Sequence, residues 1–117
     1  MYHFDEVFLP ETSQAKMFTE VQPFVQAGLN GDNVCIFAYG QTGSGKTYTM
    51  EGCTLILHDN QLQEASGILP RTAVFVQSEV QRLKQQLGKD MRVEISALEV
   101  YCDQIFDIFE SKQKSTK

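Results

Sequence analysis

A glycine-rich stretch constrains the fold of this chain more than any other segment. It matches the phosphate-binding pattern G-x-x-x-x-G-K-[ST] at every fixed position. An apolar run over residues 34–39 precedes it, and residues of fair helix propensity follow it. Because such a loop joins a strand to a helix, this order predicts a buried strand over 34–39 and a short helix over 48–51. The loop consists of Gly40, Gln41, Thr42, Gly43, Ser44, Gly45, Lys46 and Thr47.

The same loop predicts a nucleotide-binding site. Glycines allow backbone N–H groups to turn inward around an anion, and the positive N-terminus of the following helix points to the same place. In this pattern the ammonium of Lys46 reaches the terminal phosphates, and the hydroxyl of Thr47 binds magnesium. A plain turn between a strand and a helix is the disfavoured alternative, because the glycines, the Lys-Thr pair and both flanks agree.

Hydrolysis needs more than a phosphate-binding loop. A phosphoryl-transfer site also needs a carboxylate beside magnesium and a group that orients the attacking water. No aspartate is followed by glycine three positions later, as a D-x-x-G switch would require. Asp103 follows the apolar-leaning run 98–102, like a magnesium ligand at the end of a strand, but Asp-Gln after a strand is typical of a turn. We favour the turn, and the catalytic residues stay unknown.

Composition and charge exclude several classes of function. The 117 residues are 42% hydrophobic, which is enough for one domain with an ordinary core. A net charge of −5 and a pI near 4.9 argue against a general nucleic-acid or anionic-membrane surface. No run approaches the ~20 apolar residues of a membrane span, and no basic-then-apolar leader opens the chain. We therefore expect a soluble intracellular protein with no nucleic-acid partner.

The cysteines and histidines predict neither a disulfide framework nor a metal site. Cys35, Cys53 and Cys102 are odd in number, widely spaced and without a C-x-x-C pair. His3 and His58 are far apart in the chain, whereas zinc needs three or four convergent ligands. A reducing compartment is the expected setting.

The residues before the phosphate loop predict a short strand and a helix. Residues 2–8 combine apolar and polar side chains in a strand-like pattern that ends in a turn. Thr12 or Ser13 can cap a helix that runs to about Gly28. Pro23 lies inside this helix, and proline removes a backbone donor, so we expect a bend or a break there.

The residues after the loop predict a second helix and β-structure. A helix over 67–88 carries an apolar stripe, which we expect to pack on a sheet because it is too short for a coiled coil. Alternation over 91–97 predicts a strand that continues through Val100 and Cys102 after its phase slips at Leu98, which indicates a bulge or twist near Ala97. An apolar stretch over 105–109 follows. Residues 53–66 form an insertion of undetermined structure, and 110–117 a disordered tail. The whole pattern predicts an α/β fold with a central sheet flanked by helices.

Several blocks around the loop carry a more specific resemblance. They are residues 4–8 (FDEVF), Gln14 with residues 21–23 (VQP), residues 33–52, residues 67–71 (GILPR), and residues 96–101 (SALEVY) with 105–107 (IFD). In this order the blocks resemble the kinesin motor domain, and their amino-acid sequences are most similar to the kinesin-14, carboxy-terminal-motor class. The resemblance covers nearly the whole chain and is weakest in 53–66 and in the tail.

The resemblance implies part of a P-loop NTPase-type motor domain whose full-length form couples ATP hydrolysis to movement along microtubules, toward the minus end if the kinesin-14 likeness holds. It implies ATP and Mg²⁺ as cofactors and places Tyr48 against the adenine, where its ring can stack; a core-packing aromatic is the alternative. It also places residues 53–66 at a variable loop beside the nucleotide pocket. The implied location is the cytoskeleton in the cytoplasm, with the spindle as a narrower candidate.

The chain also departs from the family pattern. The family's first strand and both of its nucleotide switches fall outside these 117 residues, and Asp32 stands where an aromatic is common. We therefore expect an incomplete motor domain with weak or no ATPase activity by itself, and exposed apolar surface around residues 34–39. Two alternatives stay open. One is a truncated, noncatalytic product that binds other proteins or does not fold stably, and the other is a different P-loop enzyme such as a nucleotide kinase.

Overall fold

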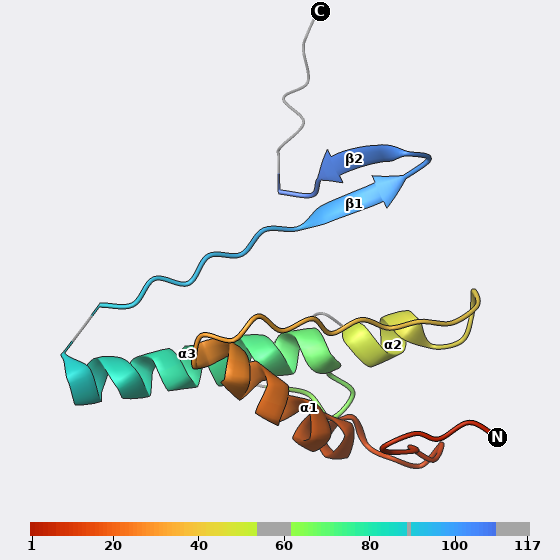
Figure 1. Ribbon diagram of the computed structural model, residues 1–117, viewed down its shortest axis with the longest axis horizontal. Helices are drawn as coiled ribbons and strands as arrows, with labels where there is room; N and C mark the ends of the chain where they lie inside the picture. The colour runs from red at the N-terminus through yellow and green to blue at the C-terminus, as the bar shows by residue number, and fades with distance from the viewer. Residues whose placement is uncertain (54–61, 89, 110–117) are drawn as a thin grey trace, which may run out of the picture.

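Helices pack together at one end of this computed structural model, and a β-hairpin lies apart from them (Figure 1). The structure describes residues 1–53, 62–88 and 90–109. Within these ranges the extended residues 90–97 join the helical part to the hairpin. The elements, in chain order, are α1 (Gln14–Leu29), α2 (Lys46–Met50), α3 (Ile68–Leu87), β1 (Leu98–Tyr101) and β2 (Gln104–Asp107).

The first helix, α1, begins and ends where the sequence predicts. The Ser13 hydroxyl caps it by accepting a hydrogen bond from the Lys16 backbone N–H at 3.2 Å. Asn30 is the C-cap residue. Of the expected bend or break at Pro23, the break is wrong, because α1 continues through this residue, and the bend stays a prediction. Proline fits helical backbone angles and removes only one donor, here the one for the Thr19 carbonyl, while the turns on both sides keep their own hydrogen bonds.

Helix α3 packs against α1, and the small core lies between them. Phe18 and Val25 of α1 are each 9% exposed, and Ile68 of α3 is 6% exposed. The rings of Phe18 and Phe75 meet edge to face, with their centroids 6.5 Å apart and their planes at 69°. The expected partner of α3, a sheet, is therefore wrong for the described residues. An apolar stripe specifies that a helix must be covered, but not by which element.

Residues 34–39 do not form the predicted buried strand. They run as an extended segment without strand pairing, and the side chains of Phe37 and Tyr39 are 76% and 93% exposed. The strand predicted over 2–8 is also not formed, and the strand predicted from residue 91 onward is formed only over Leu98–Tyr101. A strand exists only where a neighbour takes its backbone hydrogen bonds. Among the described residues these segments have one such bond, from the Ile108 N–H to the Ala97 carbonyl at 2.9 Å.

Among the described residues, the sheet consists of one β-hairpin. Strands β1 and β2 pair antiparallel, with Leu98 opposite Asp107 and Tyr101 opposite Gln104. Between them Cys102 and Asp103 have φ values of 49° and 58°, as a two-residue type I′ turn requires. The prediction that Asp103 belongs to a turn is confirmed.

The chain leaves much apolar surface uncovered. Its accessible surface is 10472 Å², whereas a folded protein of 13.2 kDa has about 6,400 Å². Its radius of gyration is 17.2 Å, against about 13 Å for a compact chain of similar length. The exposed apolar surface expected around residues 34–39 is confirmed, because Phe37 and Tyr39 are largely exposed. The α/β class is confirmed as well, with a described sheet of two strands in place of a central sheet.

Candidate functional site

The glycine-rich loop is tightly curled even though no strand precedes it. Gly43 and Gly45 have φ values of 81° and 93°, in the region that favours glycine, and Gly45 is the N-cap of α2. A Cβ at Gly40 would lie 2.4 Å from the Ser44 Oγ, so the two sides of the loop approach closely. The Ser44 N–H donates to the Gln41 carbonyl at 3.2 Å and closes the turn. The loop thus has the backbone curvature of an anion-binding cradle.

Lys46 lies across this loop. Its Nζ donates to the carbonyls of Gly40 at 2.9 Å and Gln41 at 2.8 Å, which holds a positive charge against the curled backbone. The neighbouring Thr47 is exposed at the start of α2, and residues 41–45 are exposed as well. The predicted phosphate and magnesium groups therefore come together on one open surface. An anion at the loop would compete with the two carbonyls for the ammonium.

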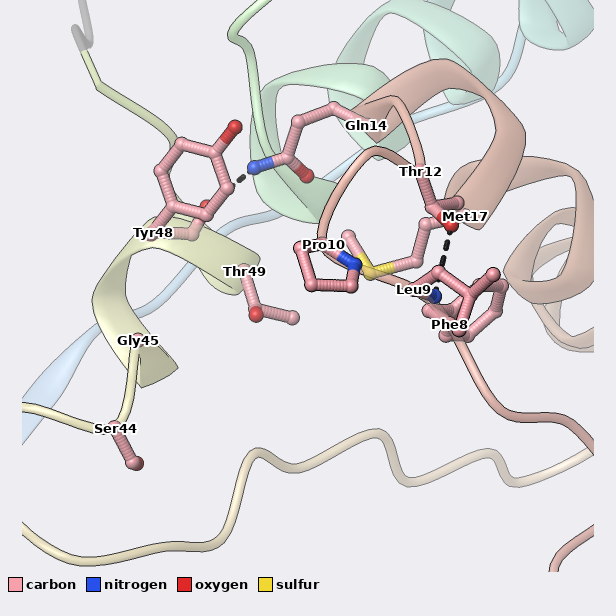
Figure 2. A pocket seen from close by; sticks show the side chains of 10 residues that line it. All are labelled: Phe8, Leu9, Pro10, Thr12, Gln14, Met17, Ser44, Gly45, Tyr48 and Thr49. Carbon is pink, nitrogen blue, oxygen red and sulfur yellow. Dashed lines mark hydrogen bonds between the residues drawn. The ribbon is translucent and has the colours of Figure 1, made fainter.

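Tyr48 is fastened to the start of α1 through Gln14. The Gln14 Nε2 donates to the backbone carbonyl of Tyr48 at 2.7 Å (Figure 2). Gln14 is 3% exposed, and its Oε1 is buried without a hydrogen-bond partner among the described residues. Tyr48 is 50% exposed and so is not buried in a core, while its place against the adenine stays a prediction. Sequence reasoning missed the contact of Gln14, whose only signal was its place in one of the matching blocks.

A cavity of about 330 Å³ lies between the start of α1 and the start of α2 (Figure 2). It reaches from the end of the glycine-rich loop, at Ser44 and Gly45, to Tyr48 and Thr49 in α2. A second hollow, of about 310 Å³, adjoins Tyr48 and is bounded by Glu64 and Ala65. A flat apolar group next to the loop would thus have a place against Tyr48. The remaining residues that line the first cavity are Phe8, Leu9, Pro10, Thr12, Gln14 and Met17.

The two ends of the predicted insertion 53–66 meet beside α2. Gly52 and Ser66 form an isolated antiparallel bridge. The Gly67 N–H donates to the Glu51 carbonyl at 3.1 Å, which joins the end of α2 to the start of α3. Residues 54–61 of this insertion lie outside the described residues, as does the predicted tail 110–117.

Gly52→Ala is expected to lower the free energy of unfolding by about 2 kcal/mol, measured by urea titration. Gly52 has a φ of 94°, and an added Cβ would lie 2.1 Å from the Ala65 carbonyl oxygen. The matched control is Gly31→Ala, because Gly31 has a φ of 107° and nothing within 4 Å of its Cβ position. Gly31→Ala should lower the free energy of unfolding by only about 1 kcal/mol, because it adds backbone strain without a clash. Equal costs would show that the bridge is not close-packed.

The other candidate groups do not add a second site. Within the described ranges no group of three or more His, Cys, Asp or Glu side chains could hold a metal ion. Cys35, Cys53 and Cys102 are free and exposed. Asp103 lies in the hairpin turn. None of the helices described is long and apolar enough to cross a membrane.

Comparisons with known proteins agree with one another. Residues 1–117 match the family model described as the kinesin motor domain. The chain is 40% identical over 97% of its length to claret segregational from Drosophila melanogaster. It is 38% identical over 99% of its length to kinesin-like protein KIN-14M from Arabidopsis thaliana, and 43% identical over 92% to carboxy-terminal kinesin 2 from Xenopus laevis. It spans only 15% of the first two relatives and 16% of the third.

Solved structures show the same likeness. The crystal structure of the Drosophila kinesin family member Kin10/NOD, in complex with divalent manganese and ADP, superposes with a TM-score of 0.79 and 32% identity. The match covers 94% of this chain and 37% of that one. NOD docked with bovine tubulin into a map of its microtubule complex gives a TM-score of 0.78.

Proposed function

Since this chain belongs to the kinesin motor domain family, we propose that it is the ATP-binding portion of a kinesin-14-type motor whose full-length form moves along microtubules. The observation that carries the proposal is the curled loop of residues 40–47, with the Lys46 ammonium across it and a cavity leading to Tyr48. The nucleotide and divalent metal in the related NOD structure support it. Movement toward the minus end is the direction that the kinesin-14 likeness favours.

Each proposed role follows from the chemistry of the side chain. The curled backbone of residues 40–45 donates N–H groups to the phosphates, and Lys46 exchanges its two carbonyl partners for phosphate oxygens. The Thr47 hydroxyl binds Mg²⁺, a hard cation that prefers oxygen ligands. Tyr48 offers its half-exposed ring to the adenine. Bound Mg²⁺ would neutralise phosphate charge, while these residues hold and orient the nucleotide.

The partner and the location follow from the family. We propose tubulin in microtubules as the partner of the full-length protein, supported by the microtubule complex of the related NOD. The corresponding location is the cytoskeleton in the cytoplasm, and the spindle is the narrower proposal. Residues 1–117 then form one unit, with 53–66 as the variable loop beside the nucleotide.

Titration of the purified chain with a fluorescent ATP analogue, with and without Mg²⁺, tests the proposed function. Saturable binding that strengthens with Mg²⁺ is expected, together with a rise in the melting temperature. At a ligand concentration 100 times Kd the folded state gains about 2.7 kcal/mol. Absence of binding in both titrations would contradict the proposal.

One observation favours a second candidate, a noncatalytic product that acts by binding other proteins. The exposed side chains of Phe37 and Tyr39 and the open hairpin present apolar surface that a partner could cover. A hydrophobic dye separates the two candidates. Strong dye binding with no cooperative melt, unchanged by magnesium nucleotide, would favour the second. The reading as a nucleotide kinase is set aside, because the kinesin family model matches the whole chain.

A further inference from the structure

The side chain of Arg71, in the first turns of α3, holds one tight turn of the backbone. Its Nε donates to the Ser66 carbonyl at 2.8 Å, and its Nη2 donates to the carbonyls of Gln63 and Glu64 at 3.2 Å and 3.1 Å. Within the turn the Ser66 N–H donates to the Gln63 carbonyl at 3.0 Å. The Ser66 Oγ accepts from the Gln63 N–H at 3.0 Å. One planar cation thus binds three carbonyls of a single turn, which the point charge of a lysine cannot reproduce.

This turn is a wall of the hollow beside Tyr48. Glu64 and Ala65 line the hollow of about 310 Å³, together with Tyr48 and with residues 10–14 at the start of α1. Ser66, which ends the turn, is only 2% exposed and forms the isolated β-bridge to Gly52, just after the end of α2. The position of the wall therefore depends on the hydrogen bonds of Arg71 and on the bridge at its end.

The phosphate loop is held by different contacts. The Lys46 ammonium bonds to Gly40 and Gln41, and none of these residues is a partner of Arg71 among the described hydrogen bonds. We propose that Arg71 is a positioning residue that fixes the turn over 63–66 as a wall of the base pocket, so that it supports binding of the purine end of a nucleotide and not of its phosphates. This inference rests on the proposed nucleotide-binding function.

Calorimetric titration with two ligands tests the proposal. Magnesium ATP carries a base, whereas magnesium tripolyphosphate carries the same phosphates without one. Arg71→Ala should weaken ATP binding about tenfold and leave tripolyphosphate binding within about twofold. Arg71→Lys should weaken ATP binding by a similar factor, because an ammonium cannot bond to the three carbonyls at once. Equal loss for both ligands, or no loss for either, would overturn the positioning role.

Further variants keep the test decisive. Arg82→Ala is the matched control, because Arg82 lies on the same helix, is half-exposed and bonds to the Glu79 carboxylate instead of to the turn. It should change neither affinity. If Arg71→Ala fails to fold, Ser66→Ala removes the hydroxyl that closes the turn and should weaken ATP binding alone, by a smaller factor.

If the wild-type chain binds neither ligand, the proposed function itself is wrong. If it binds both and the Arg71 variants weaken them equally, only this inference is wrong.

Discussion

Lys46→Ala is expected to lower the affinity for magnesium nucleotide by more than about a hundredfold, measured by titration with a fluorescent ATP analogue. The Lys46 Nζ is the cation held inside the curled loop, by the carbonyls of Gly40 and Gln41. Truncation removes the charge-assisted bonds to the phosphates. It also leaves loop carbonyls, which repel an anion, without their donor.

A matched lysine separates this effect from a change in net charge. Lys84 on α3 pairs with Asp90 at 2.6 Å, and both side chains are largely exposed. Lys84→Ala removes the same charge and should leave nucleotide affinity within about twofold, because exposed ion pairs contribute little. Wild-type affinity in Lys46→Ala would mean that the loop is not the nucleotide site.

The helices could be predicted from sequence because their signals are local. The cap at Ser13 lies three residues from the N–H that it binds, and Gly88 ends α3 with a φ of 63°. The hairpin turn at Asp103 is local in the same sense. The curled loop is also local, since its geometry depends on glycines within one short stretch, such as Gly43 and Gly45.

The strands over 34–39 and 91–97 could not be settled from sequence. Their apolar patterns are real, but a strand also needs a partner from elsewhere in the chain, and the pattern does not name it. The same limit applies to α3, whose Phe75 packs on Phe18 of α1 in place of the expected sheet. Local sequence patterns predict helices and strands, but contacts between distant segments decide whether strands pair into a sheet.

The site was predicted in part for the same reason. The loop residues and Tyr48 belong to one recognisable stretch, whereas Gln14 and Arg71 act on backbone carbonyls that no side-chain pattern marks. Gln14 bonds to a carbonyl 34 positions away, and Arg71 bonds across a turn that precedes its own helix. The residue type does not identify either acceptor, because every residue has a backbone carbonyl.

Phe18→Ala is expected to lower the free energy of unfolding by about 3 kcal/mol, measured by urea titration of the helical circular dichroism signal. Phe18 is 9% exposed and meets Phe75 edge to face, so truncation leaves a cavity between α1 and α3. Phe24 lies on the same helix but is 58% exposed, so Phe24→Ala should change stability by less than about 0.5 kcal/mol.

The loss of the Phe18 contact should also affect the nucleotide site, because α1 carries Gln14, which donates a hydrogen bond to the Tyr48 carbonyl. If α1 is held by Phe18, the same variant should weaken nucleotide binding, and saturating nucleotide should restore part of the lost stability. Equal effects of the two phenylalanine variants would place the stabilising contacts elsewhere. Loss of stability without loss of affinity would show instead that the loop and Tyr48 bind nucleotide without support from α1.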